Sequence, residues 1–86
     1  MLTTSRYPSS KTKIFAKNLA GTIGTLYSAR GKKSVESIIQ LARKKGEERI
    51  CIVVENNKKP QKIMFIKVNE DATWAWLPGE IEINGA

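Results

Sequence analysis

The chain has 86 residues, of which 41% are hydrophobic and 27% charged, and these proportions predict one folded domain over residues 1–86. The sequence has no histidine and one cysteine, Cys51, which excludes an internal disulfide, a histidine-activated nucleophile and an ordinary zinc site. Fifteen lysines and arginines against eight acids give a net charge of +7. This excess of positive charge predicts a polyanionic partner, and nucleic acid is favoured over an acidic membrane or an acidic protein.

The first part of the chain predicts a strand, a helix and a second strand. Residues 1–5 form the first strand, which a proline ends. Ser9 or Ser10 can then cap a helix that runs to about residue 20, because its apolar positions share one face. The glycines that follow favour the end of that helix, and residues 25–29 are expected to form the next strand.

The second part predicts one more helix and a run of strands. Ser34 can cap a helix whose apolar positions recur with helical spacing, and Gly46 is suited to end it. Residues 50–54 are apolar at every position, which indicates a strand covered on both faces. Residues 63–68 are expected to return antiparallel to it. Two further strands are predicted over residues 73–77 and around Ile81, the second of them at an edge.

This order predicts an α/β fold, a mixed sheet of five to six strands with two helices in the order βαβαββ. Parallel strands end at the same edge of a sheet, so the loops 6–10, 30–34 and 55–60 should open together. The net charge is +7 for residues 1–33, +4 for residues 34–69 and −4 for residues 70–86. We therefore expect one basic edge and an acidic edge opposite to it.

Two of these basic loops lead into the first turn of a helix, where unpaired backbone N–H groups and the helix dipole favour an anion. A phosphate group fits such a place, with hydroxyl groups positioning the nucleic-acid backbone and not reading its sequence. The predicted RNA-binding residues are Thr4, Ser5, Arg6, Ser9, Ser10, Lys11, Lys13, Arg30, Lys32, Lys33, Lys58 and Lys59.

Other candidate chemistry in the sequence is weak. The only adjacent acids, Glu47-Glu48 and Glu70-Asp71, fall in predicted turns, so we expect no enzyme, no cofactor and no metal site. Trp74 and Trp76 lie on one face of their strand and could either stack on bases or pack in the core. With short apolar runs, no export signal and a single cysteine, the sequence also predicts a cytoplasmic protein without a membrane partner.

Several of these segments resemble one known family. The run TTSRYPSS at residues 3–10, followed by Phe15-Ala16-Lys17 and Leu19, resembles the opening signature of Brix-domain proteins. The RGKKS loop at residues 30–34 and the Trp-Ala-Trp strand at residues 74–76 are similar to later parts of that domain. The archaeal ribosomal biogenesis members are the most similar. The resemblance implies binding of rRNA or pre-rRNA during ribosome assembly and pre-rRNA processing.

The resemblance covers residues 2–78 and only the first half of the domain. It implies a fold like half of a Brix domain, which is similar to the anticodon-binding domain of class IIa aminoacyl-tRNA synthetases. A second copy of the chain or another chain could replace the missing half. Two other hypotheses stay open, a chromatin-like protein that binds duplex DNA and a protein–protein assembly module of a ribosome-biogenesis complex.

Overall fold

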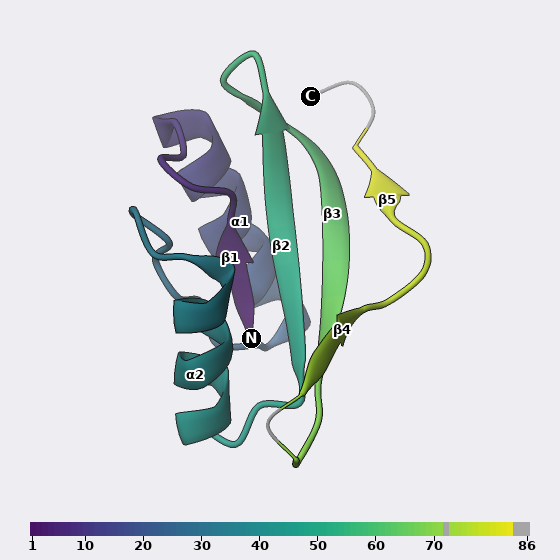
Figure 1. Ribbon diagram of the computed structural model, residues 1–86. Helices are drawn as coiled ribbons and strands as arrows, with labels where there is room; N and C mark the ends of the chain where they lie inside the picture. Colours follow the sequence, from purple (N-terminus) through teal and green to yellow (C-terminus); the bar gives the residue numbers. More distant parts are fainter. Residues whose placement is uncertain (72, 84–86) are drawn as a thin grey trace.

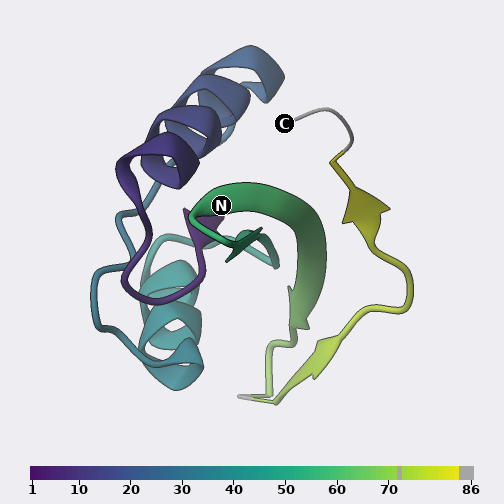
Figure 2. The same cartoon turned by 90° about the horizontal axis from the view of Figure 1, so that it is seen from above.

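A curved mixed sheet with one helix on each face makes up the computed structural model, which describes residues 1–71 and 73–83 (Figures 1 and 2). Two helices and a five-stranded sheet confirm the predicted α/β class. The elements in chain order are β1 (Leu2–Thr4), α1 (Ser10–Ile23), α2 (Val35–Lys44), β2 (Arg49–Asn56), β3 (Lys59–Val68), β4 (Trp74–Trp76) and β5 (Ile81–Glu82).

The sheet has the strand order β1-β2-β3-β4, and β5 pairs with the other end of β3. β1 runs parallel to β2, with Leu2 opposite Cys51, whereas β3 is antiparallel to β2, β4 and β5. The parallel pair confirms the topological premise of the site prediction, because the chain leaves β1 and β2 at the same edge of the sheet.

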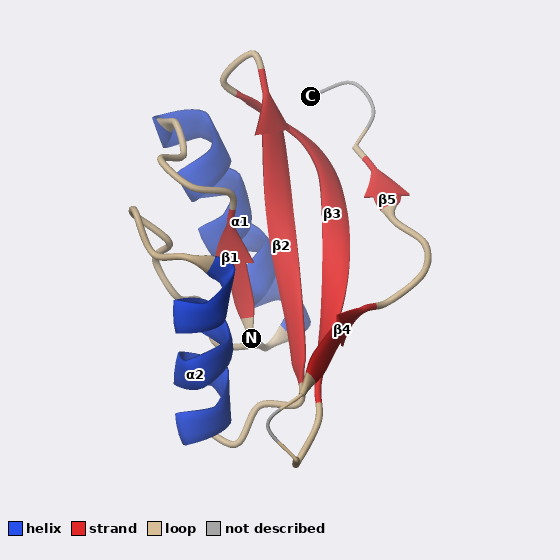
Figure 3. Cartoon of the chain, viewed as in Figure 1, coloured by secondary structure: helices blue, strands red, loops and turns tan. Residues whose placement is uncertain are grey.

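The strand predicted over residues 25–29 is reduced to a single bridge, in which Tyr27 pairs with Leu2 of β1. The amide of Leu2 donates to the carbonyl of Leu26 at 2.8 Å, and the amide of Ser28 donates to the carbonyl of Leu2 at 2.9 Å. β1 has only three residues, so it has few backbone groups with which a further strand could form hydrogen bonds. The chain between α1 and α2 is loop throughout (Figure 3), and the predicted order βαβαββ was wrong at this segment.

Helix α1 is longer than predicted and ends at Ile23, not near residue 20. Gly24, at φ 73°, takes the left-handed conformation of a helix cap, and its amide donates to the carbonyl of Ala20. Of the two glycines near the end of α1, Gly24 is the one that needs the conformational freedom of glycine. Gly21 lies inside the helix and does not end it.

Alternate residues of β2 pack against the two helices, as expected for a strand covered on both faces. Ile50 and Ile52 belong to an apolar cluster with residues of α2, and Val53 belongs to a second cluster with residues of α1. The helix residues that are buried in these clusters are Ile38, Ile39 and Ala42 from α2, and Ala16 and Ala20 from α1. One strand therefore anchors both helices to the sheet.

The sheet continues from β3 into β4 and β5, which pair with opposite ends of β3 (Figure 2). Trp74 packs against the α2-side cluster and meets Trp76 edge to face, with ring centroids 6.1 Å apart. Core packing therefore accounts for Trp74. Trp76 is 45% exposed, and Ile81 of β5 is 54% exposed.

Candidate nucleic-acid interface

The three basic loops converge at the edge where β1 and β2 end, at the upper end of the sheet in Figure 1. The amide of Tyr7, after β1, donates to the carbonyl of Gly31 at 3.0 Å. The Ser9 hydroxyl lies 2.8 Å from the carbonyl oxygen of Lys58, in the β2–β3 turn. One backbone hydrogen bond and one side-chain contact thus join the loops that the sequence predicted to meet.

Seven cationic side chains from these loops and from the first turns of α1 are exposed. We call this set the basic edge: Arg6, Lys11, Lys13, Lys32, Lys33, Lys58 and Lys59. The Lys33 ammonium group donates to the carbonyl of Ala29 at 2.9 Å and stays exposed. The Arg6 guanidinium carbon lies 5.8 Å from the ring centroid of Tyr7, which is 70% exposed and was not among the predicted site residues. The edge therefore offers an aromatic face beside its cations.

The carboxylate of Glu55 occupies the start of α1, where the sequence predicted a bound phosphate. One oxygen, Oε2, accepts hydrogen bonds from the Thr12 hydroxyl at 2.6 Å, the Ser9 hydroxyl at 2.8 Å and the Ser9 amide at 3.1 Å. The Ser9 hydroxyl is equally close to Lys58 O and has one proton, so the two acceptors share it. The chain's own anion thus fills this cap, and the prediction of Ser9 as a phosphate ligand was wrong.

The environment of Glu55 keeps its carboxyl group ionised. The hydrogen bond from Thr12 is the largest cause that lowers the pKa of Glu55, and the bonds from Ser9 and the nearby charge of Lys58 act in the same direction. A signal for this contact exists in the sequence. The first turn of α1 carries no acid, and Glu55 is the only acid in the neighbouring loop 55–60.

Arg30 and Thr4 lie beneath the basic edge, which corrects their prediction as phosphate ligands. Arg30 is 4% exposed; its Nη1 donates to the carbonyl of Thr4 at 2.8 Å and its Nε to the carbonyl of Lys33 at 2.6 Å. The Thr4 side chain is fully buried, and its hydroxyl donates to the carbonyl of Ser5. Burial lowers the pKa of Arg30, as does the charge of Arg6 to a smaller extent. The guanidinium group of Arg30 thus joins the loop at residues 30–34 to the end of β1 by hydrogen bonds.

The two remaining predicted serines differ in what they can offer. The hydroxyl of Ser5 accepts the amide of Glu55 at 3.4 Å and is half-buried, so it supports the loop from within. Ser10 is exposed at the head of α1. The start of α2 is a conventional cap in which the Ser34 hydroxyl accepts the amide of Ser37 at 3.2 Å.

An open hollow lies between the start of α1 and the β2–β3 turn. Asn57 and Lys58 in that turn have φ angles of 52° and 62°, a left-handed pair typical of a two-residue hairpin connection. The residues that line the hollow are Ser9, Ser10, Lys11, Asn57, Lys58 and Lys59. The structure thus brings four of the predicted ligands that remain exposed, one serine and three lysines, around a single surface.

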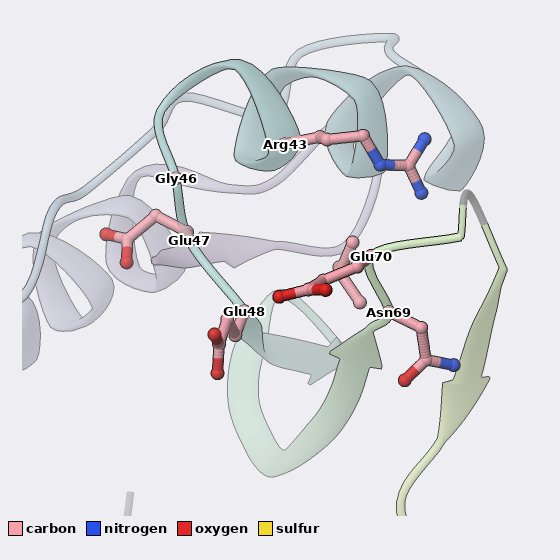
Figure 4. Close-up of a pocket in the computed structure, with 7 residues that line it drawn as sticks. Arg43, Gly46, Glu47, Glu48, Asn69 and Glu70 are labelled. Atoms are coloured by element: carbon pink, nitrogen blue, oxygen red, sulfur yellow. The ribbon is translucent and has the colours of Figure 1, made fainter.

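The opposite end of the sheet is not the acidic edge that the sequence predicted. Glu47, Glu48 and Glu70 line a pocket there, but Arg43 from α2 lines it as well (Figure 4). The amino-terminal ammonium group also lies there, 3.6 Å from Glu47. Charges of both signs alternate at this end because α2 ends there with the run Arg43-Lys44-Lys45. The end opposite to the basic edge therefore carries mixed charge.

Two kinds of feature are absent from residues 1–71 and 73–83. Within them, no group of three or more Cys, Asp or Glu side chains is placed to hold a metal ion. In the same part of the chain, no helix combines the length and the apolar character that crossing a membrane requires.

Comparison with known proteins gives one consistent result, although no family model matches the chain. A probable Brix domain-containing ribosomal biogenesis protein from Pyrococcus abyssi is 34% identical over 86 residues, which are 99% of this chain and 38% of that protein. A protein of the same name from Methanothermobacter thermautotrophicus is 35% identical over 66 residues, which are 77% of this chain and 40% of the relative.

Two solved structures share the fold. A probable ribosomal biogenesis protein from Aeropyrum pernix K1 superposes with a TM-score of 0.87 at 30% identity, over 98% of this chain and 47% of that one. Mil, an archaeal Imp4-like protein, gives a TM-score of 0.71 at 33% identity, over 85% of this chain and 45% of that one. The chain thus spans less than half the length of the relatives that it matches.

Proposed function

This chain belongs to the Brix-domain ribosomal biogenesis family, corresponding to the amino-terminal part of its members, and we propose that it binds rRNA or pre-rRNA during ribosome assembly. The basic edge is the proposed RNA-binding surface. We treat residues 1–86 as one domain, similar to half of a Brix domain, that acts by binding and not by catalysis. Ribosome assembly also agrees with the cytoplasmic location predicted from the sequence.

The observation that carries this proposal is the convergence of three loops and the start of α1, which together expose seven cations at one edge of the sheet. Neutralised phosphates supply most of the affinity of proteins for nucleic acids, and this contribution does not depend on sequence. Lysine and arginine side chains on neighbouring loops can contact successive phosphates of one RNA strand. The proposed contacts are Arg6, Ser10, Lys11, Lys13, Lys32, Lys33, Lys58 and Lys59.

Charge removal at two places tests the proposal. A variant with Lys11, Lys58 and Lys59 changed to alanine loses three charges from the basic edge. Its matched control, Lys44, Lys45 and Lys67 changed to alanine, loses three exposed charges from the other end of the molecule. We expect weaker binding of a labelled rRNA hairpin by the first variant, with a salt dependence smaller by about one unit per lost phosphate contact, and little change in the control.

Three outcomes contradict the proposal at different levels. Equal losses in both variants mean that the basic edge is not the site. Binding by the unmodified chain without any salt dependence contradicts phosphate recognition altogether. Displacement of the labelled hairpin by duplex DNA at lower concentrations than by unlabelled rRNA, at fixed salt, favours a DNA-binding protein.

We also propose that a second copy of this chain, or another chain, supplies the surface that the longer relatives carry in one polypeptide. The support is that the chain covers 45% and 47% of the two solved relatives. Light scattering tests the second copy directly. A mass of twice 9.6 kDa supports it, and a mass of 9.6 kDa contradicts the second copy.

A further inference from the structure

We propose that Glu55 is a positioning residue that fixes the β2–β3 turn against the start of α1 and so sets the spacing of Lys11, Lys58 and Lys59 for phosphate binding. This inference rests on the proposed binding of RNA by the basic edge. It assigns a role to an acid in a place where charge alone predicts none, because a carboxylate among these lysines repels an approaching phosphate.

Glu55 lies near the end of β2, at a shift in the pairing register with β3. The register between β2 and β3 shifts between Val54 and Glu55, and such a bulge re-aims the side chain that follows it. The backbone amide of Glu55 donates to the Ser5 hydroxyl at 3.4 Å, which connects the same residue to the chain leaving β1. The backbone of Glu55 thus contacts the start of the connection between β1 and α1, and its side chain contacts the end of that connection and the first turn of α1.

The partners of the carboxylate are themselves held firmly. Thr12 is fully buried, and its hydroxyl lies 2.6 Å from Oε2 of Glu55. Ser9 caps α1 and also lies 2.8 Å from the carbonyl oxygen of Lys58. The bond from Thr12 to the carboxylate is charge-assisted and belongs to the strong class, and the neutral contact of Ser9 with Lys58 joins the helix start to the turn.

The lysines that the contact positions line one hollow. Lys11 follows the first residue of α1, whereas Lys58 and Lys59 lie in and just after the hairpin turn, and all three border the same surface with Ser10. Their side chains are long and mobile, so the positions of their backbones decide whether they can reach one phosphate together. Glu55 is hydrogen-bonded to Ser9 and Thr12 at the start of α1, and Ser9 in turn contacts the carbonyl oxygen of Lys58 in the turn.

Positioning and simple charge predict opposite results when the carboxylate is removed. If Glu55 only repels RNA, the substitution Glu55→Gln raises the net charge by one and tightens binding. If Glu55 positions the lysines, the same substitution weakens binding and lowers its salt dependence, because fewer phosphates are contacted at once. Glu36→Gln is the matched control, since Glu36 is an exposed acid in the first turn of α2.

The experiment measures anisotropy of a fluorescein-labelled rRNA hairpin with the full chain over a salt series. We expect Glu55→Gln to weaken binding by up to about tenfold, equivalent to about 1.4 kcal/mol, with a smaller salt slope, and Glu36→Gln to tighten it slightly. Folding is checked by thermal unfolding. Thr12→Val, which removes the hydroxyl that donates to Glu55 and no charge, should weaken binding in the same direction and serves alone if Glu55→Gln does not fold.

A folded Glu55→Gln variant that binds as tightly as the unmodified chain, or more tightly, overturns the inference. Where only Thr12→Val folds, unchanged binding by that variant overturns it. Either result can occur while removal of Lys11, Lys58 and Lys59 still weakens binding, in which case RNA binding at the basic edge stands and only the positioning role fails. Absence of RNA binding by the unmodified chain contradicts the proposed function and the inference with it.

Discussion

At the residue scale, two cations of the same loop have opposite roles. Arg30 is buried and donates to the carbonyls of Thr4 and Lys33, whereas Lys32 is fully on the surface. In the sequence both belong to one basic run, and nothing local distinguishes them. The difference arises from distant parts of the chain, because the loop folds over the end of β1 and the planar guanidinium group can bridge two carbonyl groups there.

Replacing these two residues should have different effects on the stability of the chain. We expect Arg30→Ala to lower the free energy of unfolding by about 1–3 kcal/mol, because buried carbonyl oxygens lose their donor. Lys32→Ala should change it by less than about 0.5 kcal/mol, as surface substitutions usually do. Urea unfolding followed by circular dichroism measures both. Equal stabilities of the two variants contradict the structural role of Arg30.

Glu55 also gives the stability a pH dependence. Its pKa is lower in the folded chain than in the unfolded chain, chiefly through the Thr12 hydrogen bond, so its contribution is fully present above the ordinary glutamate value of about 4.3. The contribution is lost as the pH falls through that value and then through the folded-state pKa. Glu55→Gln should therefore flatten the acid side of the stability profile.

Unfolding by urea at a series of pH values from neutral to acid tests this expectation. Asp71, whose pKa is lowered by hydrogen bonds from Thr73, contributes in the same direction, so a smaller acid dependence should remain in the Glu55→Gln variant. An unaltered pH profile in that variant contradicts the ionised contact.

At the scale of the elements, local signals predicted what local interactions determine. The serine caps and apolar faces of α1 and α2 were visible in the sequence and are confirmed at Ser9 and Ser34. The prediction of a strand over residues 25–29 was wrong. The segment has adequate strand propensity, but its neighbour β1 has only three residues and pairs with it at a single bridge. The contact of Glu55 with α1 spans more than 40 positions of the chain, and no periodic pattern reports such a contact.

The glycines at the end of α1 allow a paired test of this boundary. Gly21→Ala should stabilise the chain by up to about 1 kcal/mol, since the position is helical and a Cβ there has no neighbour within 4 Å. Gly24→Ala should destabilise it by about 1 kcal/mol or more, because φ is 73° and a side chain strains that conformation. Thermal unfolding compares them, and a helix ending at residue 20 would make both substitutions alike.

At the scale of the whole molecule, topology proved more informative than any single residue. The order of strands and helices predicted that three loops share one edge, and hydrogen bonds between the loops confirm that they meet. The acidic edge expected opposite to them was wrong, since cations at the end of α2 lie among the acids. The net charge of each segment therefore predicted the basic edge. It did not predict that the cations at the end of α2 lie beside the acids at the opposite end of the sheet.

The same arrangement separates the tryptophans from the basic edge. β4 pairs with residues Ile66–Val68, the end of β3 that is remote from Lys59, so Trp76 lies towards the other end of the sheet (Figure 1). If phosphates bind at the basic edge, bases need not reach this ring. We expect Trp76→Ala to leave the affinity for an rRNA hairpin within about twofold, because a stacked base contributes about 1–3 kcal/mol and none is lost. Fluorescence anisotropy measures the affinity, and a tenfold loss in a folded variant would instead place RNA across the open face of β3 and β4.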